Sequence, residues 1–103
     1  MNRIEKIQNM LQASPKDNFL RHALALEWIK EEKDNEAKDL FFAILSESPD
    51  YVGTYYHLAK LLERNGETES AIEWYERGMK AAKQANDNHA YNELQSALED
   101  LIF

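Results

Sequence analysis

The stretch "SPKDNFLRHALALEW" (residues 14–28) is followed, 34 positions later, by the similar stretch "SPDYVGTYYHLAKLL" (residues 48–62). Both begin with Ser-Pro, which disfavours helical backbone at the serine, and both continue with apolar residues at helical spacing. The same offset aligns small and large apolar residues further on: Leu24-Ala25 with Leu58-Ala59, Ala37 with Ala71, and Phe41 with Tyr75. A period of this length predicts a repeat made of two helices and a turn.

The composition favours an all-α protein. The 103 residues include 3 Gly, 2 Pro and no Cys, which leaves few turns and excludes a disulfide framework. Apolar periodicity predicts six helices joined by short loops, so sequential helices should be antiparallel neighbours. Their expected ranges are 2–13, 18–32, 35–47, 51–65, 68–84 and a last helix that begins near residue 88 and includes Leu101.

Three positions carry local predictions. Asp17 is the expected N-cap of the second helix. Gly66 follows the fourth helix, where a left-handed C-cap favours glycine. Gly78 lies inside the fifth helix, where glycine costs about 1 kcal/mol relative to alanine. That cost predicts a packing reason, namely the close approach of a neighbouring helix.

Residues 18–83 resemble the tetratricopeptide repeat family, and "NGETESAIEWYERGM" (residues 65–79) is the clearest match. The resemblance places repeats at 18–51 and 52–85 in a single domain of residues 1–103. It implies antiparallel helix-turn-helix repeats in a short right-handed α-solenoid, with a flanking helix at 1–14 and a capping helix at 88–103. The residues that fit the family pattern are Leu24, Ala25, Trp28, Ala37, Phe41 and Pro49, and then Tyr55, Leu58, Ala59, Gly66, Ala71, Tyr75 and Gly78.

The sequence departs from the family pattern at three positions. Arg21 stands where an aromatic residue is usual, and Ile44 stands where a small residue is usual. Lys83 occupies the usual place of a proline. The lysine predicts that the fifth helix runs longer than in a standard repeat.

Motifs and charge disfavour several classes of function. The sequence holds no HExxH motif, phosphate loop or serine elbow, so we expect neither an enzyme nor a cofactor. A formal net charge of −7 argues against a nucleic-acid-binding protein. No stretch approaches the roughly 18 apolar residues of a membrane span, and the amphipathic N-terminus lacks the apolar region of a secretory signal. We therefore expect a cytoplasmic protein with no membrane contact.

The resemblance implies that the first helix of each repeat lines a concave groove. The candidate groove residues are Phe19, His22, Leu26 and Lys30 from one helix, and Tyr56, His57, Lys60 and Arg64 from the next. Aromatic and cationic side chains together suit an acidic or carboxylate-ended peptide. We expect the histidines His22 and His57 to add charge as the pH falls toward 6. An alternative stays open, in which Lys60 and Arg64 are only a solvated pair one helical turn apart.

The family resemblance does not extend to one well-known ligand. Family members that clamp the C-terminal carboxylate of chaperones use Lys, Asn, Asn, Lys and Arg. The matching places here hold His22, Leu26, His57 and His89, followed by Glu93 or Tyr91. None of these residues fits, so we do not expect that partner.

Two other interpretations remain open. His22, His57 and His89 could project into one groove, but no carboxylate or local spacing supports a metal site. Self-association is the other, because the C-terminal stretch "LEDLIF" (residues 98–103) ends in the apolar residues Leu101, Ile102 and Phe103, and Trp74 is a further candidate. Such a cluster either folds back on the fifth helix or offers a surface for a homo-oligomer.

Overall fold

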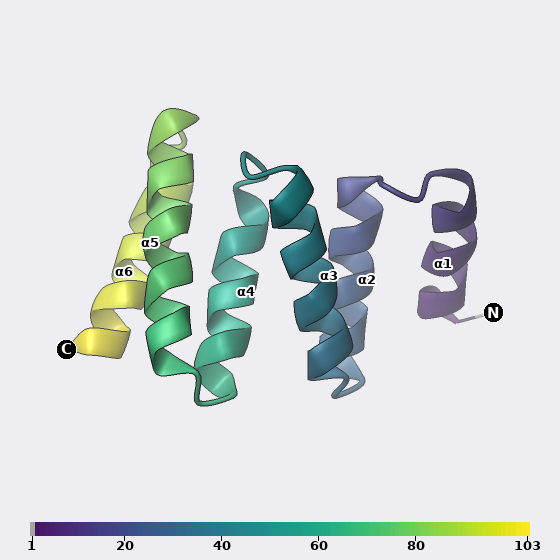
Figure 1. The fold of residues 1–103 in the computed structure, drawn as a ribbon, viewed down its shortest axis with the longest axis horizontal. Helices are drawn as coiled ribbons and strands as arrows, with labels where there is room; N and C mark the ends of the chain where they lie inside the picture. Colours follow the sequence, from purple (N-terminus) through teal and green to yellow (C-terminus); the bar gives the residue numbers. More distant parts are fainter. Residues whose placement is uncertain (1) are drawn as a thin grey trace. The chain divides into compact units, whose positions relative to one another are not determined.

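The computed structural model describes residues 2–103, which form six α-helices and no β-strand (Figure 1). The structure therefore confirms the all-α prediction, and each predicted helix end lies within two residues of the observed one. The helices are α1 (Arg3–Ala13), α2 (Asn18–Lys30), α3 (Asp34–Glu47), α4 (Gly53–Arg64), α5 (Thr68–Gln84) and α6 (Asn88–Ile102). Their contacts divide the described chain into two compact units, one up to Glu47 and the other from Ser48 to Phe103.

Side-chain caps fix the N-termini of three helices. The Asn2 side chain accepts a hydrogen bond from the Glu5 amide at 2.8 Å. Asp17 accepts one from the Leu20 amide at 3.0 Å, which confirms the predicted cap of α2. Asp87 caps α6 in the same way. Each such cap is typically worth about 1 kcal/mol of helix stability.

In the first unit, α2 packs antiparallel against α3, and α1 packs on α2 (Figure 1). Ala25 and Ala37 are fully buried, so the two helices approach closely where these small residues lie. Phe41 and Ile44 are also fully buried and fill the space between the helices. Ile7 is the buried residue of α1, so α1 contributes an apolar side chain to its contact with α2.

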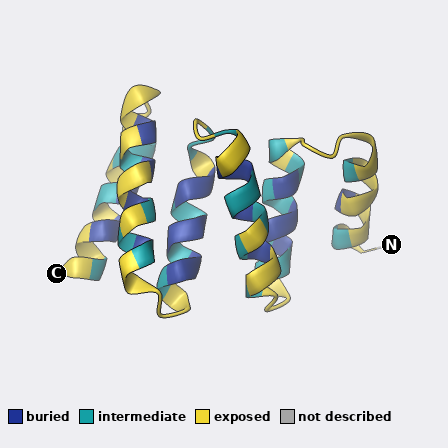
Figure 2. Cartoon of the chain, in the orientation of Figure 1, coloured by how far each residue is buried: buried dark blue, intermediate teal, exposed yellow. Residues whose placement is uncertain are grey.

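In the second unit, α5 packs between α4 and α6 and runs opposite to both (Figure 1). Figure 2 shows α4 as buried or partly buried along most of its length, and only its end residues Gly53 and Arg64 are exposed. Leu94 and Leu98 of α6 are buried, and α6 packs on α5. The α5 helix is the longest of the six at 17 residues, as the lysine at position 83 predicts.

Gly78 of α5 confirms the predicted close approach of a neighbouring helix. A Cβ atom at this position would lie 2.6 Å from the Cβ of Tyr55 in α4 and 3.0 Å from a Leu94 methyl in α6. Real Cβ atoms are essentially never that close to another heavy atom. The glycine therefore lets three helices meet at one level of the second unit.

The helices α2, α4 and α5 end in the same kind of turn. Glu32, Gly66 and Asn86 follow them with positive φ angles of 60°, 80° and 56°. Past Gly66, the amide of Glu67 donates to the Leu62 carbonyl at 2.9 Å, which is the long bond of a Schellman motif. The predicted left-handed cap at Gly66 is thus confirmed.

Candidate protein-binding surfaces on α2 and α4

Four of the predicted groove residues lie on one face of α2, and we call them the α2 surface: Phe19, His22, Leu26 and Lys30. They follow each other at intervals of three or four residues, which places them on one side of a helix. Together with Arg3, Ala23, Glu27 and Ile29 they line a hollow of about 450 Å³. Phe19 is 73% exposed at this hollow although it is a large apolar residue.

The charged groups at the α2 hollow form a triad of Arg3, Glu27 and Lys30. Glu27 is only 8% exposed. One of its carboxylate oxygens lies 2.6 Å from Nε of Arg3, and the other lies 3.0 Å from Nζ of Lys30. Lys30 is thus already paired with a carboxylate.

Sequence reasoning did not find Arg3 or Glu27 as part of this surface. The spacing of Glu27 and Lys30 is the one available signal, since residues three apart on a helix are neighbours. The contact with Arg3 joins two helices, α1 and α2. No local pattern in the sequence predicts this contact.

His22 lies partly against the core of the first unit. Its ring centroid is 5.5 Å from that of Phe41, which is fully buried in α3. One part of the imidazole therefore packs on the neighbouring helix, and the residue is half-buried. His22 still lines the hollow, so the structure brings all four predicted α2 residues together.

The other predicted groove residues lie on α4, and we call them the α4 surface: Tyr56, His57, Lys60 and Arg64. Nζ of Lys60 is 5.8 Å from the centroid of the Tyr56 ring, within the range of a cation–π contact. The rings of Tyr56 and His57 meet edge to face with centroids 5.6 Å apart. Arg64 lies one turn further on and is exposed.

His57 differs from the prediction in its protonation. Burial lowers the pKa of this imidazole, and the nearby charge of Glu93 only partly opposes the effect. His57 therefore gains its positive charge at a lower pH than a solvated histidine would. The prediction that it adds charge near pH 6 is corrected accordingly.

Glu63, which lies one helical turn from Lys60, accepts a hydrogen bond from the buried Tyr75. The Tyr75 hydroxyl donates a hydrogen bond of 2.8 Å to a carboxylate oxygen of Glu63. Burial, and then this hydrogen bond, raise the pKa of Tyr75, so the phenol stays protonated and keeps donating. The same oxygen of Glu63 is 3.9 Å from Nζ of Lys60. The ion pair between Lys60 and Glu63 is therefore a long one.

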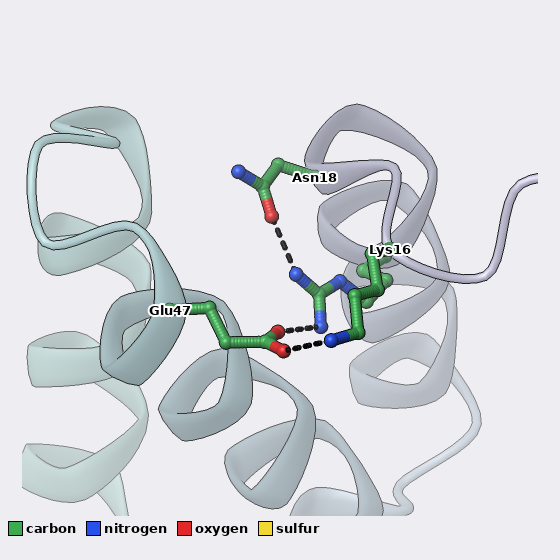
Figure 3. Close-up of polar contacts among 4 residues, drawn as sticks. Lys16, Asn18 and Glu47 are labelled. Carbon is green, nitrogen blue, oxygen red and sulfur yellow. Dashed lines mark hydrogen bonds and ion pairs between the residues drawn. The ribbon is translucent and has the colours of Figure 1, made fainter.

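Arg21, which replaces the usual aromatic residue, is buried in a polar network of the first unit (Figure 3). One terminal nitrogen donates to Glu47 and the other to Asn18, both at 2.6 Å. Lys16 lies 3.3 Å from the second oxygen of Glu47. The hydrogen bond from Arg21, followed by that from Lys16, lowers the pKa of Glu47.

Two further kinds of site are absent from residues 2–103. No three His, Asp or Glu side chains in this part of the chain come close enough together to hold a metal ion. None of the helices formed by these residues is both long enough and apolar enough to cross a membrane.

These antiparallel helix pairs, with small residues at their contacts and a repeat of 34 residues, define a helical-repeat protein. The sequence profile of the tetratricopeptide repeat family matches residues 29–98, and the chain belongs to that family. Proteins of this family are generally protein-interaction modules and are typically non-catalytic.

Solved structures of similar proteins agree with this assignment. A tetratricopeptide repeat domain protein from Salinibacter ruber is 41% identical, with a TM-score of 0.83 over 85% of this chain and 89% of that one. A Bordetella parapertussis protein is 27% identical, with a TM-score of 0.85 over 98% and 88% of the two chains. The TPR2B domain of yeast Sti1, solved as a complex with pHsp70, shares the fold at 17% identity, with a TM-score of 0.87 over 95% and 78% of the two chains. No curated protein matches the chain.

Proposed function

We propose that this protein is a non-catalytic adaptor that binds acidic, partly apolar segments of partner proteins, with the α2 surface and the α4 surface each serving as a binding surface. The observation that carries the proposal is the α2 hollow with Phe19 exposed beside it. Family membership supports a protein as the partner. The binding residues are inferred from the side chains of this chain.

The α2 surface has the features of a docking site. Its hollow of about 450 Å³ lies within the range of roughly 300–1,000 Å³ that is usual for ligand sites. Phe19, Ala23, Leu26 and Ile29 supply an apolar lining. An exposed aromatic ring is unfavourable in water, so contact with an apolar side chain of a partner would stabilise the complex.

The α4 surface supports an acidic ligand. Lys60 and Arg64 supply cationic donors, and Tyr56 supplies an aromatic face next to them. Hydrogen bonds between such cations and carboxylates are stronger than those between neutral groups. These cations stand out on a protein whose formal net charge is −7.

The yeast Sti1 domain supports a protein ligand in general terms, because its structure was solved as a complex with pHsp70. The identity of 17% does not carry that ligand over to this chain. Here His22, Leu26 and His57 occupy places where chaperone-clamping relatives have other residues. We therefore propose a different acidic segment as the ligand.

The test begins with a partner captured from native lysate by the wild-type chain and then purified. Its affinity is measured by calorimetry for wild type, Phe19→Ser and the double variant Lys60→Glu/Arg64→Glu. The control is Lys80→Glu, which makes the charge change of one of these two substitutions at an exposed residue of α5. We expect Phe19→Ser and the double variant each to weaken binding by about 1 kcal/mol or more, and Lys80→Glu to leave it unchanged.

Salt provides a second readout in the same experiment. Binding to wild type should weaken between about 50 and 500 mM salt, because exposed charges are screened over shorter distances. Equal affinities for wild type, Phe19→Ser and the double variant would rule out both surfaces as the binding site.

A homo-oligomer is the second candidate function, and the end of α6 favours it. Leu98 is buried there, but Ile102 is 48% exposed and Phe103 is 98% exposed. Exposed apolar residues at one place often mark a contact surface. Light scattering coupled to gel filtration tests this, since the double variant Ile102→Ser/Phe103→Ser should reduce the molar mass if these residues hold two copies together.

A further inference from the structure

The Glu27 triad is the feature of the first unit that packing does not explain. A charged group loses its hydration when it is buried, so a carboxylate is retained inside a helix contact only where partners compensate it. The residue 34 positions later is Leu61, which is also buried. The matching place in the second repeat is thus filled by an ordinary apolar side chain. A carboxylate at position 27 is therefore not a requirement of the repeat.

The carboxylate of Glu27 holds two cations that remain open to solvent. It contacts Arg3 through Nε at 2.6 Å and Lys30 through Nζ at 3.0 Å. The side chains of Arg3 and Lys30 are nevertheless 71% and 73% exposed. Two positive charges against one negative leave the triad with a formal charge of +1.

The position of these cations relates them to the apolar hollow. Arg3 and Lys30 line the same hollow as Phe19 and Leu26. An apolar recess with cations beside it is complementary to an apolar side chain that has a carboxylate next to it. Arginine and lysine are also the residues that most often bind carboxylates through charged hydrogen bonds.

We propose that Arg3 and Lys30 bind a carboxylate of the partner segment while a bulky apolar side chain of that segment fills the α2 hollow. Glu27 is then a positioning residue, which keeps two like charges side by side. The flanking helix α1 thereby becomes part of the binding surface through Arg3. This inference rests on the proposed function and names the chemistry that the α2 surface recognises.

The experiment is an NMR titration of the full ¹⁵N-labelled chain with short blocked peptides. The acidic probe is acetyl-Glu-Phe-Glu-amide, and the neutral probe is acetyl-Gln-Phe-Gln-amide. A third probe, acetyl-Gln-Phe-Gln with a free C-terminus, distinguishes a chain-terminal carboxylate from one on a side chain. Both sources belong to the proposed chemistry, and the tighter of the two acidic probes identifies which one the site prefers.

We expect the amide signals of Phe19, Leu26 and Lys30 to shift with all three probes. The preferred acidic probe should bind about fivefold more tightly than the neutral one at low salt, as two exposed charge contacts allow. Arg3→Gln and Lys30→Gln should each reduce this preference, and 500 mM salt should nearly remove it. Lys16→Gln is the control, because Lys16 is exposed in the same unit and pairs with Glu47.

Each contrary result has a distinct meaning. Equal binding of acidic and neutral probes, with shifts at the hollow, would overturn the triad as a carboxylate site and leave the proposed function standing. The same holds if Arg3→Gln and Lys30→Gln retain the full preference. Absence of any shift on α2 would overturn this inference, while the captured-partner experiment decides the proposed function separately. Lys30→Gln keeps the test valid even if Arg3→Gln loosens α1, since Lys30 and Glu27 both lie on α2.

Discussion

The two repeats solve one packing problem with different residues. In the second unit, Tyr55 lies directly on Gly78, and its hydroxyl donates to the Pro49 carbonyl at 2.5 Å. The positions 34 residues earlier hold Arg21 and Ile44. There the isoleucine is fully buried, and the arginine extends to Glu47 instead.

We infer from this difference that the two positions are coupled within a repeat. The ring of Tyr55 fits between α4 and α5 because Gly78 of α5 has no side chain at that place. Where α3 presents Ile44, the equivalent place on α2 holds a flat guanidinium that can reach polar partners. The family pattern of an aromatic residue opposite a small one therefore changes at both positions together.

The largest expected effect comes from Gly78→Ala. The added methyl would lie 2.6 Å from the Cβ of Tyr55, an atom that no rotamer change can move away. We expect the free energy of unfolding to fall by about 3 kcal/mol, at the upper end of the usual cost of overpacking. Urea unfolding followed by circular dichroism measures it.

Gly53→Ala is the matched control for this variant. A Cβ at Gly53 would have no atom within 4 Å, so the change should stay within about ±0.5 kcal/mol. Equal midpoints for the two variants would show that α4 and α5 do not meet closely at Gly78.

The exchange of Arg21 and Ile44 tests the coupling itself. Arg21→Tyr should lower the free energy of unfolding by about 2 kcal/mol, because it removes the hydrogen bonds to Glu47 and Asn18 and inserts a ring against Ile44. Adding Ile44→Gly makes room for the ring, as in the second repeat. A double-mutant cycle should give a favourable coupling of about 1 kcal/mol or more. Simple additivity of the two changes would refute the coupling.

Turn chemistry gives a smaller, stabilising effect. Glu32 has a φ of 60° at the place where the second repeat has Gly66. Left-handed backbone costs a non-glycine residue roughly 1–2 kcal/mol, part of which glycine loses again through its greater freedom when unfolded. We expect Glu32→Gly to raise the urea midpoint by an amount equivalent to up to about 1 kcal/mol. The adjacent Glu31→Gly, at a negative φ of −89°, should not raise it.

The smallest expected effect is the pH dependence that Glu47 contributes. Its pKa is lower in the folded state than its ordinary value of 4.5, so its ion pairs stabilise the fold fully only above that value. This contribution is lost as the pH falls from near 4.5 through the folded pKa. Urea midpoints of wild type and Glu47→Gln should therefore converge as the pH is lowered from 6 toward 3. A difference between them that does not change with pH would contradict the role of this carboxylate charge.

The sequence was sufficient for the fold because the fold depends on local patterns. Ser-Pro pairs and apolar periodicity located the helices, and a glycine inside α5 identified a close helix contact at Gly78. The α2 surface was also predictable, since Phe19 and Leu26 lie on one helix face at regular spacing.

The remaining features depend on contacts that no local pattern records. Arg21 was visible as a departure from the family, but its partner Glu47 lies on another helix. The contact between Arg3 and Glu27 also joins two helices, α1 and α2, so the sequence did not predict it. The lowered pKa of His57 follows from burial, which depends on packing around the residue rather than on its neighbours in sequence.

Chemical-shift mapping tests most directly whether a protein segment binds to the α2 and α4 surfaces. The ¹⁵N-labelled chain is titrated with the binding segment of the captured partner, and the amide signals are followed residue by residue. We expect the largest shifts at Phe19, Leu26, Tyr56 and Lys60. Shifts confined to α5 and to the end of α6, around Trp74 and Phe103, would contradict it.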